Sequence, residues 1–160
     1  MNKLGIDFGK VIIGATLQGV HDTSFLGSTL PAAMKTPAAE GAFDAVEQLV
    51  SRFQGQVWIV SKCGPSVEKK SRAWLDHWDF YGRTGLSREN LRFCRKRPDK
   101  APICRQLGIN HFIDDRLDVL SPMRGEVPRL LLFGEQGRSL QIPSWVEPVQ
   151  TWTEVLSALS

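Results

Sequence analysis

Short apolar segments alternate along the chain with longer amphipathic ones. The short segments are bounded by polar or turn-forming residues, as is typical of buried strands, and they cover residues 4–8, 56–60, 91–94, 111–113 and 129–133. In the segments between and after them, apolar residues recur every three or four positions, which predicts helices over 36–53, 65–80, 99–107 and 152–159. Strands that alternate with helices predict an α/β fold, a Rossmann-like three-layer α/β/α sandwich around a mostly parallel sheet.

The region between the first strand and the first helix has a different character. Residues 14–36 are rich in Gly, Ser, Thr and Ala and have weak periodicity, so we expect a long loop or a small flap that could hold a hairpin. Thr36 and Pro37 then form a capping pair, which predicts that the first helix opens there. Gly55 is the predicted stop of this helix.

Length and composition are typical of a globular protein. The 160 residues predict a single domain over 1–160, and the net charge of +3 suits an anionic partner. No apolar run is long enough for a membrane span, and we expect neither membrane association nor a secretory signal. Cys63, Cys94 and Cys104 show no CxxC spacing, which favours reduced thiols and a cytoplasmic location.

Polar residues stand where the predicted strands end. Ligands of open parallel sheets bind beyond these carboxyl ends, and this makes the polar residues there candidates for a site. Each residue alone is more often a cap, a turn residue or a solvated charge. The pair Asp114 and Asp115 is less ordinary, because adjacent carboxylates at a buried strand end repel each other unless a cation or hydrogen-bond donors compensate. The full set is Asp7, Ser61, Lys62, Lys100, Asp114 and Asp115.

In this order and spacing, the set resembles the motifs of the haloacid dehalogenase-like superfamily over residues 4–133. The first motif is an aspartate that ends the first strand (Asp7), and the second is a serine or threonine that ends the next strand (Ser61). The third is a lysine ahead of a helix (Lys100), and the fourth is an acidic pair after a later strand (residues 114–115).

The resemblance implies a phosphohydrolase with Asp7 as its catalytic nucleophile. The carboxylate attacks phosphorus and forms an aspartyl-phosphate. Ser61 and Lys100 assist this catalysis by binding the transferring phosphoryl group. Lys62 and Lys10, which adjoin the motif segments, are further candidates for phosphate binding.

The resemblance also implies a magnesium ion, since attack on a phosphate dianion requires a cation. The expected ligands are the carboxylates of Asp7, Asp114 and Asp115 and the backbone carbonyl of Gly9. Asp118 lies one helical turn beyond Asp114. It is either a further acid behind the metal or a solvent-facing helix residue.

Gly9 is where the chain departs from the family pattern. Phosphatases of this superfamily usually have a second aspartate there, which serves as general acid and then as base. Three interpretations stay open: substrates with good leaving groups such as acyl phosphates or phosphoanhydrides, a proton supplied by His21 or Asp22 of the flap, or phosphate binding with little turnover. The alternative function is therefore a catalytically weak or inactive phosphate-binding or scaffold protein.

The chain leaves room only for a small flap, not for a separate cap domain. Nearly capless members of this superfamily tend to act on macromolecules or to use partners as a lid. We expect a phosphorylated substrate, either a small molecule or a macromolecule. Residues 92–105 hold six Lys or Arg and a single acid, so a nucleotide or a nucleic-acid phosphate is one option, and a solvated basic face is the other.

Overall fold

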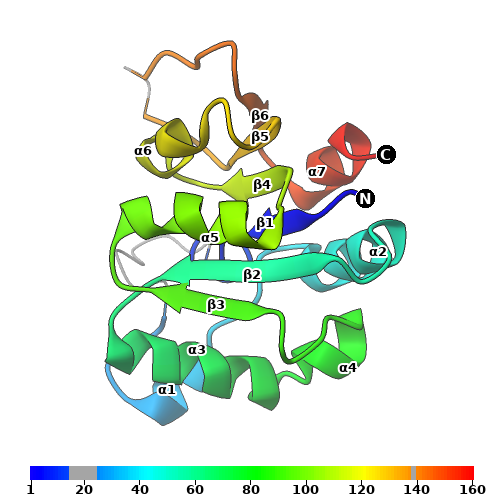
Figure 1. Cartoon of the computed structure of the whole chain (residues 1–160). Coiled ribbons are helices and arrows are strands. Elements are labelled where there is room, and N and C mark those ends of the chain that lie inside the picture. The colour runs from blue at the N-terminus through cyan, green and yellow to red at the C-terminus, as the bar shows by residue number, and fades with distance from the viewer. Residues whose placement is uncertain (15–24, 138–139) are drawn as a thin grey trace.

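The computed structural model describes residues 1–14, 25–137 and 140–160. Its centre is a six-stranded sheet in the order β3-β2-β1-β4-β5-β6 (Figure 1). Every pairing between neighbouring strands is parallel. The strands are β1 (Leu4–Ile6), β2 (Val57–Lys62), β3 (Leu91–Cys94), β4 (His111–Asp114), β5 (Arg129–Phe133) and β6 (Glu147–Val149).

Helices cover both faces of this sheet, and the predicted three-layer, Rossmann-like α/β sandwich is confirmed. On one face, apolar side chains of α2 (Ala42–Arg52), α3 (Pro65–His77), α4 (Phe80–Thr84) and α7 (Trp152–Ala158) share a core with β1. On the other face, α5 (Lys100–Leu107) and α6 (Leu117–Leu120) pack against a second core that includes Phe112 of β4 (Figure 1). The remaining elements are α1 (Leu30–Met34), which packs on α3, and the 3₁₀ turns η1 (Arg97–Asp99) and η2 (Ser121–Met123).

None of the helices within the described residues combines the length and the apolar character that crossing a membrane requires.

The strand order fixes where a ligand site can form. The chain runs from β1 outward through β2 and β3 and then returns to the opposite side of β1 with β4. In open α/β sheets this reversal of direction leaves a crevice at the carboxyl ends of the strands. Asp7 directly follows β1, and its N–H donates to the carbonyl of Ile113 in β4 at 2.9 Å. The ladder between the two strands therefore places Asp7 at the reversal point.

The tight packing of β1 explains its small, apolar composition. Leu4 and Ile6 are fully buried in one core, and Gly5 faces the other core. A Cβ atom on Gly5 would lie 2.5 Å from the ring of Phe112, its partner in β4, so a larger side chain would collide with it. The first strand is thus packed against both cores.

The start of the first long helix was predicted incorrectly. The capping pair at 36–37 suggested a start there, but α2 begins at Ala42, after Gly41 with a left-handed φ of 77°. Thr36 is fully buried, and its hydroxyl accepts a hydrogen bond from the N–H of Leu26 at 2.9 Å. Its carbonyl accepts another from the indole of Trp74 at 2.8 Å. Tertiary contacts occupy the groups that would otherwise cap a helix.

Other boundaries also differ from the sequence prediction. The helix predicted over 65–80 ends at His77, and α4 follows it after a turn in which Asp79 has a φ of 50°. Within the predicted flap over 14–36, the structure places α1, which is capped by the hydroxyl of Thr29. Residues 15–24, among them the candidates His21 and Asp22, lie outside the described residues.

Candidate active site

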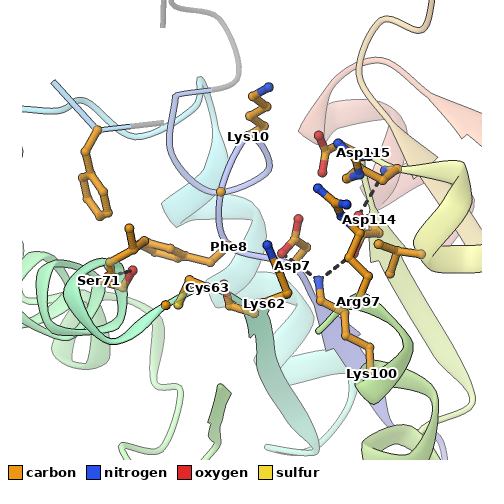
Figure 2. Close-up of a pocket in the computed structure, with 17 residues that line it drawn as sticks. Asp7, Phe8, Lys10, Lys62, Cys63, Ser71, Arg97, Lys100, Asp114 and Asp115 are labelled. Atoms are coloured by element: carbon orange, nitrogen blue, oxygen red, sulfur yellow. Dashed lines mark hydrogen bonds and ion pairs between the residues drawn. The ribbon is translucent and has the colours of Figure 1, made fainter. Parts of the chain in front are cut away.

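A cavity of about 440 Å³ opens at the carboxyl ends of the central strands (Figure 2). It is lined by every residue that the sequence analysis assigned to nucleophilic attack, phosphate binding or metal binding. These residues are Asp7, Gly9, Lys10, Ser61, Lys62, Lys100, Asp114 and Asp115. The sequence did not single out the other residues that line it, which are Phe8, Phe25, Cys63, Gly64, Val67, Ser71, Arg97, Arg116 and Val119.

Lys100 lies at the centre of the site and bridges two carboxylates. Its Nζ is 2.9 Å from an oxygen of Asp7 and 2.8 Å from an oxygen of Asp114 (Figure 2). The side chain is only 3% exposed, although it comes from the first turn of α5, where lysine is usually solvated. Burial disfavours the charged ammonium, but the charges of Asp7 and Asp114 outweigh burial and raise the pKa of Lys100. Lys100 therefore carries a positive charge inside the site.

Three carboxylates share this small space. Asp7, Asp114 and Asp115 each offer an oxygen atom, and these oxygens lie within 4.8 Å of one another. Burial, and then the negative charges of Asp7 and Asp114, raise the pKa of Asp115. Burial and the charge of Asp7 likewise raise the pKa of Asp114, although Lys100 opposes the shift. With all four groups ionised, Lys100 leaves two negative charges uncompensated.

The donor set fits a magnesium ion. Mg²⁺ prefers hard oxygen ligands, is commonly held by one or two carboxylates together with substrate oxygens, and would balance the two remaining charges. Asp7, Asp114 and Asp115 are the cluster that meets this description within the described part of the chain. Gly9, whose carbonyl the resemblance implies as a further ligand, lines the same cavity.

A tight turn after β1 shapes the rim of the cavity. The carbonyl of Phe8 accepts hydrogen bonds from the N–H groups of residues 11–13, at 3.3, 2.9 and 3.3 Å. Its ring is buried and packs edge-on against Trp74, 5.6 Å between centroids, which anchors the turn. Lys10 adopts a left-handed φ of 61°, uncommon for a residue with a side chain. In Figure 2 its ammonium points away from the carboxylates.

The end of β2 supplies the opposite wall. Ser61 is the buried second-to-last residue of β2, and Lys62 is the exposed last residue. The N–H of Cys63 donates to the carbonyl of Cys94 at 2.9 Å, which extends the contact with β3 before α3 begins at Pro65. Cys63 is a free thiol, and burial raises its pKa. Its thiol is thus neutral at physiological pH and acts as a packing group.

The segment after the acidic pair positions Asp114 from behind. The N–H of Arg116 donates to the second oxygen of Asp114 at 3.0 Å. The guanidinium of Arg116 binds both oxygens of Asp118 at 2.9 Å. Asp118 is more than half exposed and does not line the cavity, so its solvent-facing interpretation is confirmed. Arg116 could have been suspected from its place directly after the motif.

Lys100→Met is expected to destabilise the metal-free protein by about 3–5 kcal/mol, because it leaves the buried carboxylates without their cation. Added Mg²⁺ should recover much of this loss, since it supplies the missing positive charge. Urea unfolding with and without Mg²⁺ measures both effects. Lys96→Met, at an exposed lysine four residues earlier, is the matched control and should cost less than about 0.5 kcal/mol. An equal loss with and without Mg²⁺ would contradict a metal-binding cluster.

No family model matches the sequence, and no curated protein matches it significantly. Solved structures do match its fold. A HAD-family hydrolase from Deinococcus radiodurans R1, with bound phosphate and sodium, has a TM-score of 0.64 at 14% identity and covers 99% of this chain and 95% of its own. A haloacid dehalogenase-like family hydrolase from Xanthomonas campestris has a TM-score of 0.63 at 9% identity, with 99% and 94% coverage.

A third similar structure, from Burkholderia xenovorans LB400, is named a haloacid dehalogenase-like hydrolase. Its TM-score is 0.56 at 18% identity, and the match covers 78% of this chain and 58% of the Burkholderia protein. This chain thus spans little more than half of that protein, but nearly the whole length of the other two. At such identities the likeness shows the fold, and the chain has the haloacid dehalogenase-like fold that its motifs predicted.

Proposed function

We propose that this protein is a magnesium-dependent phosphohydrolase that acts through an aspartyl-phosphate on Asp7. The observation that carries the proposal is the buried group in which Lys100 bridges Asp7 and Asp114, with Asp115 alongside. A structural ion pair between Lys100 and one carboxylate would already be neutral. It does not explain why two further carboxylates lie in the same buried space. The third carboxylate is costly unless a cation joins it.

Asp7 is placed to act as the nucleophile. It is the member of the group at the reversal point of the sheet, and its side chain is 10% exposed, against 1% for Asp114. A phosphoryl group in the cavity would meet the carboxylate of Asp7, the ammonium of Lys100 and the hydroxyl of Ser61. The two donors would stabilise charge that develops on the phosphoryl oxygens.

Asp7, Asp114, Asp115 and the carbonyl of Gly9 would hold the Mg²⁺ ion. When bound, the ion supplies positive charge that lets a carboxylate approach a phosphate dianion. Lys100 then keeps the carboxylate of Asp7 oriented through its 2.9 Å contact.

Gly9 determines which substrates this site can process by itself. It has no side chain to protonate a leaving group, so leaving groups that are stable as anions should react best. His21 or Asp22 could supply a proton for other substrates. A phosphate-binding protein with little turnover is the second candidate, and Gly9 is the observation that favours it. The substrate is a phosphorylated compound, a small molecule or a macromolecule, with a nucleotide or a nucleic-acid phosphate as one option.

The basic stretch over 92–105 does not form a continuous surface of unpaired positive charge outside the cavity. Arg95 pairs with Glu68 at 2.9 Å, and Arg105 pairs with Glu126 at 2.7 Å. Arg97 and Lys100 both line the cavity. The charge of this stretch is thus directed partly to the site and partly to ion pairs, which supports binding of a single phosphorylated group better than a long phosphate track.

Phosphate release from a panel of phosphate compounds, with Mg²⁺ and after chelation, tests the proposal. We expect release that requires Mg²⁺ and decreases from acetyl phosphate through p-nitrophenyl phosphate to alkyl phosphates, because the leaving group must depart without a proton. Chelation should reduce the rate by about 10²-fold or more, and added Mg²⁺ should restore it. Release that persists in chelator would contradict the proposal. No release from any compound, with Mg²⁺ binding intact, would favour the phosphate-binding alternative.

A further inference from the structure

The cavity has a buried floor and a basic rim. The floor holds the buried side chains of Asp7, Ser61 and Lys100. Lys62 at the end of β2 and Arg97 in η1 line the same cavity and are exposed. Lys10 lines it too, but its ammonium points away from the carboxylates (Figure 2). We call Lys62 and Arg97 the basic rim. Lys62 ends β2 and Arg97 follows the neighbouring strand β3, so an anion in the cavity can meet a cation from each of two adjacent segments.

Lack of a carboxylate partner within the described residues distinguishes the basic rim from Lys100 and Arg116, which line the same cavity. Across residues 1–14, 25–137 and 140–160, six arginines form ion pairs with carboxylates: Arg72, Arg88, Arg95, Arg105, Arg116 and Arg129. Arg116 also lines the cavity, but its guanidinium is taken up by Asp118. Lys62 and Arg97 have no carboxylate within ion-pair distance in this part of the chain. Both remain available to an anionic ligand.

The direction of attack relates the rim to the leaving group. In phosphoryl transfer the attacking and leaving oxygens lie roughly in line. A phosphoryl group attacked by the buried Asp7 therefore directs its leaving group away from the floor, toward the exposed side chains that line the cavity, Lys62 and Arg97 among them. Since Gly9 offers no proton, a fixed positive charge is the remaining way for these residues to stabilise the departing oxygen.

We propose that the basic rim is a subsite for a second anionic group, and that the preferred substrates are phosphoanhydrides whose leaving group is itself a phosphate. This inference rests on the proposed function of Asp7. A phosphate leaving group carries negative charge before the reaction and gains more as the bond breaks. It matches both the two cations and the absence of a general acid.

The reaction balances without any added acid. An oxygen of Asp7 forms a bond to the terminal phosphorus, and the bond from phosphorus to the bridging oxygen breaks. The electron pair stays on that oxygen, so the second phosphate leaves as an anion between Lys62 and Arg97. Water then adds to phosphorus and the bond to Asp7 breaks, which regenerates the carboxylate. Both protons of the water stay on the released phosphate.

The test compares inorganic pyrophosphate with acetyl phosphate as substrates. Both have good leaving groups, but acetyl phosphate has an uncharged acetyl group where pyrophosphate has a second phosphate. In Lys62→Gln and in Arg97→Gln, we expect kcat/KM for pyrophosphate to decrease about tenfold relative to that for acetyl phosphate, as loss of one hydrogen bond to a charged group predicts. The double variant should lower the ratio by about 30-fold or more.

Exposed lysines outside the cavity provide the controls. Lys69→Gln on α3 and Lys96→Gln beside Arg97 should leave the ratio within about twofold of the unchanged protein, as expected for surface charges. A ratio that is unchanged in the double variant would overturn the subsite, and so would turnover of acetyl phosphate with none of pyrophosphate. Turnover of neither compound would instead overturn the proposed function.

Discussion

Asp7→Asn is expected to abolish magnesium-dependent phosphate release, with a loss of about 10⁴-fold or more. The substitution keeps the size of the side chain but removes the nucleophilic charge. It also removes one of the two carboxylates that Lys100 contacts, at 2.9 Å. The loss should appear in kcat with every substrate, since the same nucleophile serves all of them. Steady-state phosphate release measures it, with p-nitrophenyl phosphate and acetyl phosphate as substrates.

Asp118→Asn is the matched control for this prediction. Asp118 is a carboxylate of the same site region, but it lies outside the cavity and pairs with Arg116 on the surface. Its substitution should change kcat by less than about threefold, in keeping with the small energy of an exposed ion pair. Circular dichroism would establish that both variants are folded. Comparable activity of Asp7→Asn and Asp118→Asn would exclude Asp7 as the nucleophile.

Gly9→Asp is expected to extend hydrolysis to substrates with poor leaving groups. An aspartate there would provide the general acid that the sequence lacks, which is worth about 10²–10⁴-fold where the leaving oxygen must be protonated. The φ of Gly9 is not positive, so an aspartate there causes no strain from a left-handed backbone. We expect kcat/KM for glycerol phosphate to rise about 10²-fold or more. The value for acetyl phosphate should change little, because its leaving group departs without a proton.

Gly9→Asn separates proton transfer from the effect of adding a side chain. Asparagine has the size and polarity of aspartate but cannot donate the proton as an acid. Rates with glycerol phosphate should therefore rise in Gly9→Asp and not in Gly9→Asn. Equal rates in the two variants would contradict the interpretation that the missing acid at Gly9 limits the substrate range.

The sequence could predict that the candidate residues lie together, because they follow a few strand ends. In a parallel sheet, residues that follow neighbouring strands meet at one edge, and the motif order assigned Asp7, Ser61 and Asp114 to such positions. The structure places them around one cavity. The mostly parallel sheet was predictable for a related reason, since short apolar runs that alternate with amphipathic helices have few other arrangements.

Tertiary contacts explain what the sequence did not predict. The local pattern at Thr36 is that of a helix cap, but its hydroxyl and carbonyl accept hydrogen bonds from Leu26 and Trp74, which are 10 and 38 residues away in the sequence. β6 has three residues and contains Pro148, and α6 has four residues, too few for either period to appear.

The basic rim shows the same limit of sequence analysis. Arg97 is one of the six basic residues within 92–105, and nothing in the sequence around it distinguishes it from Arg95. Only the fold turns Arg97 toward the cavity and Arg95 toward Glu68. Sequence spacing identifies the residues of a motif. Whether any other charged residue faces the cavity or an ion-pair partner depends on its neighbours in the folded structure.

The most direct test of the central claim is to trap the phosphoryl group on Asp7. Protein mixed with acetyl phosphate and Mg²⁺ would be quenched in acid, digested and analysed by mass spectrometry, with Asp7→Asn treated in parallel. We predict one added phosphoryl group on the peptide that contains Asp7, lost on mild alkaline treatment as an acyl phosphate should be, and absent from Asp7→Asn. Rapid phosphate release with Asp7 unmodified at every quench time would contradict the account, as would a phosphoryl group on any other residue.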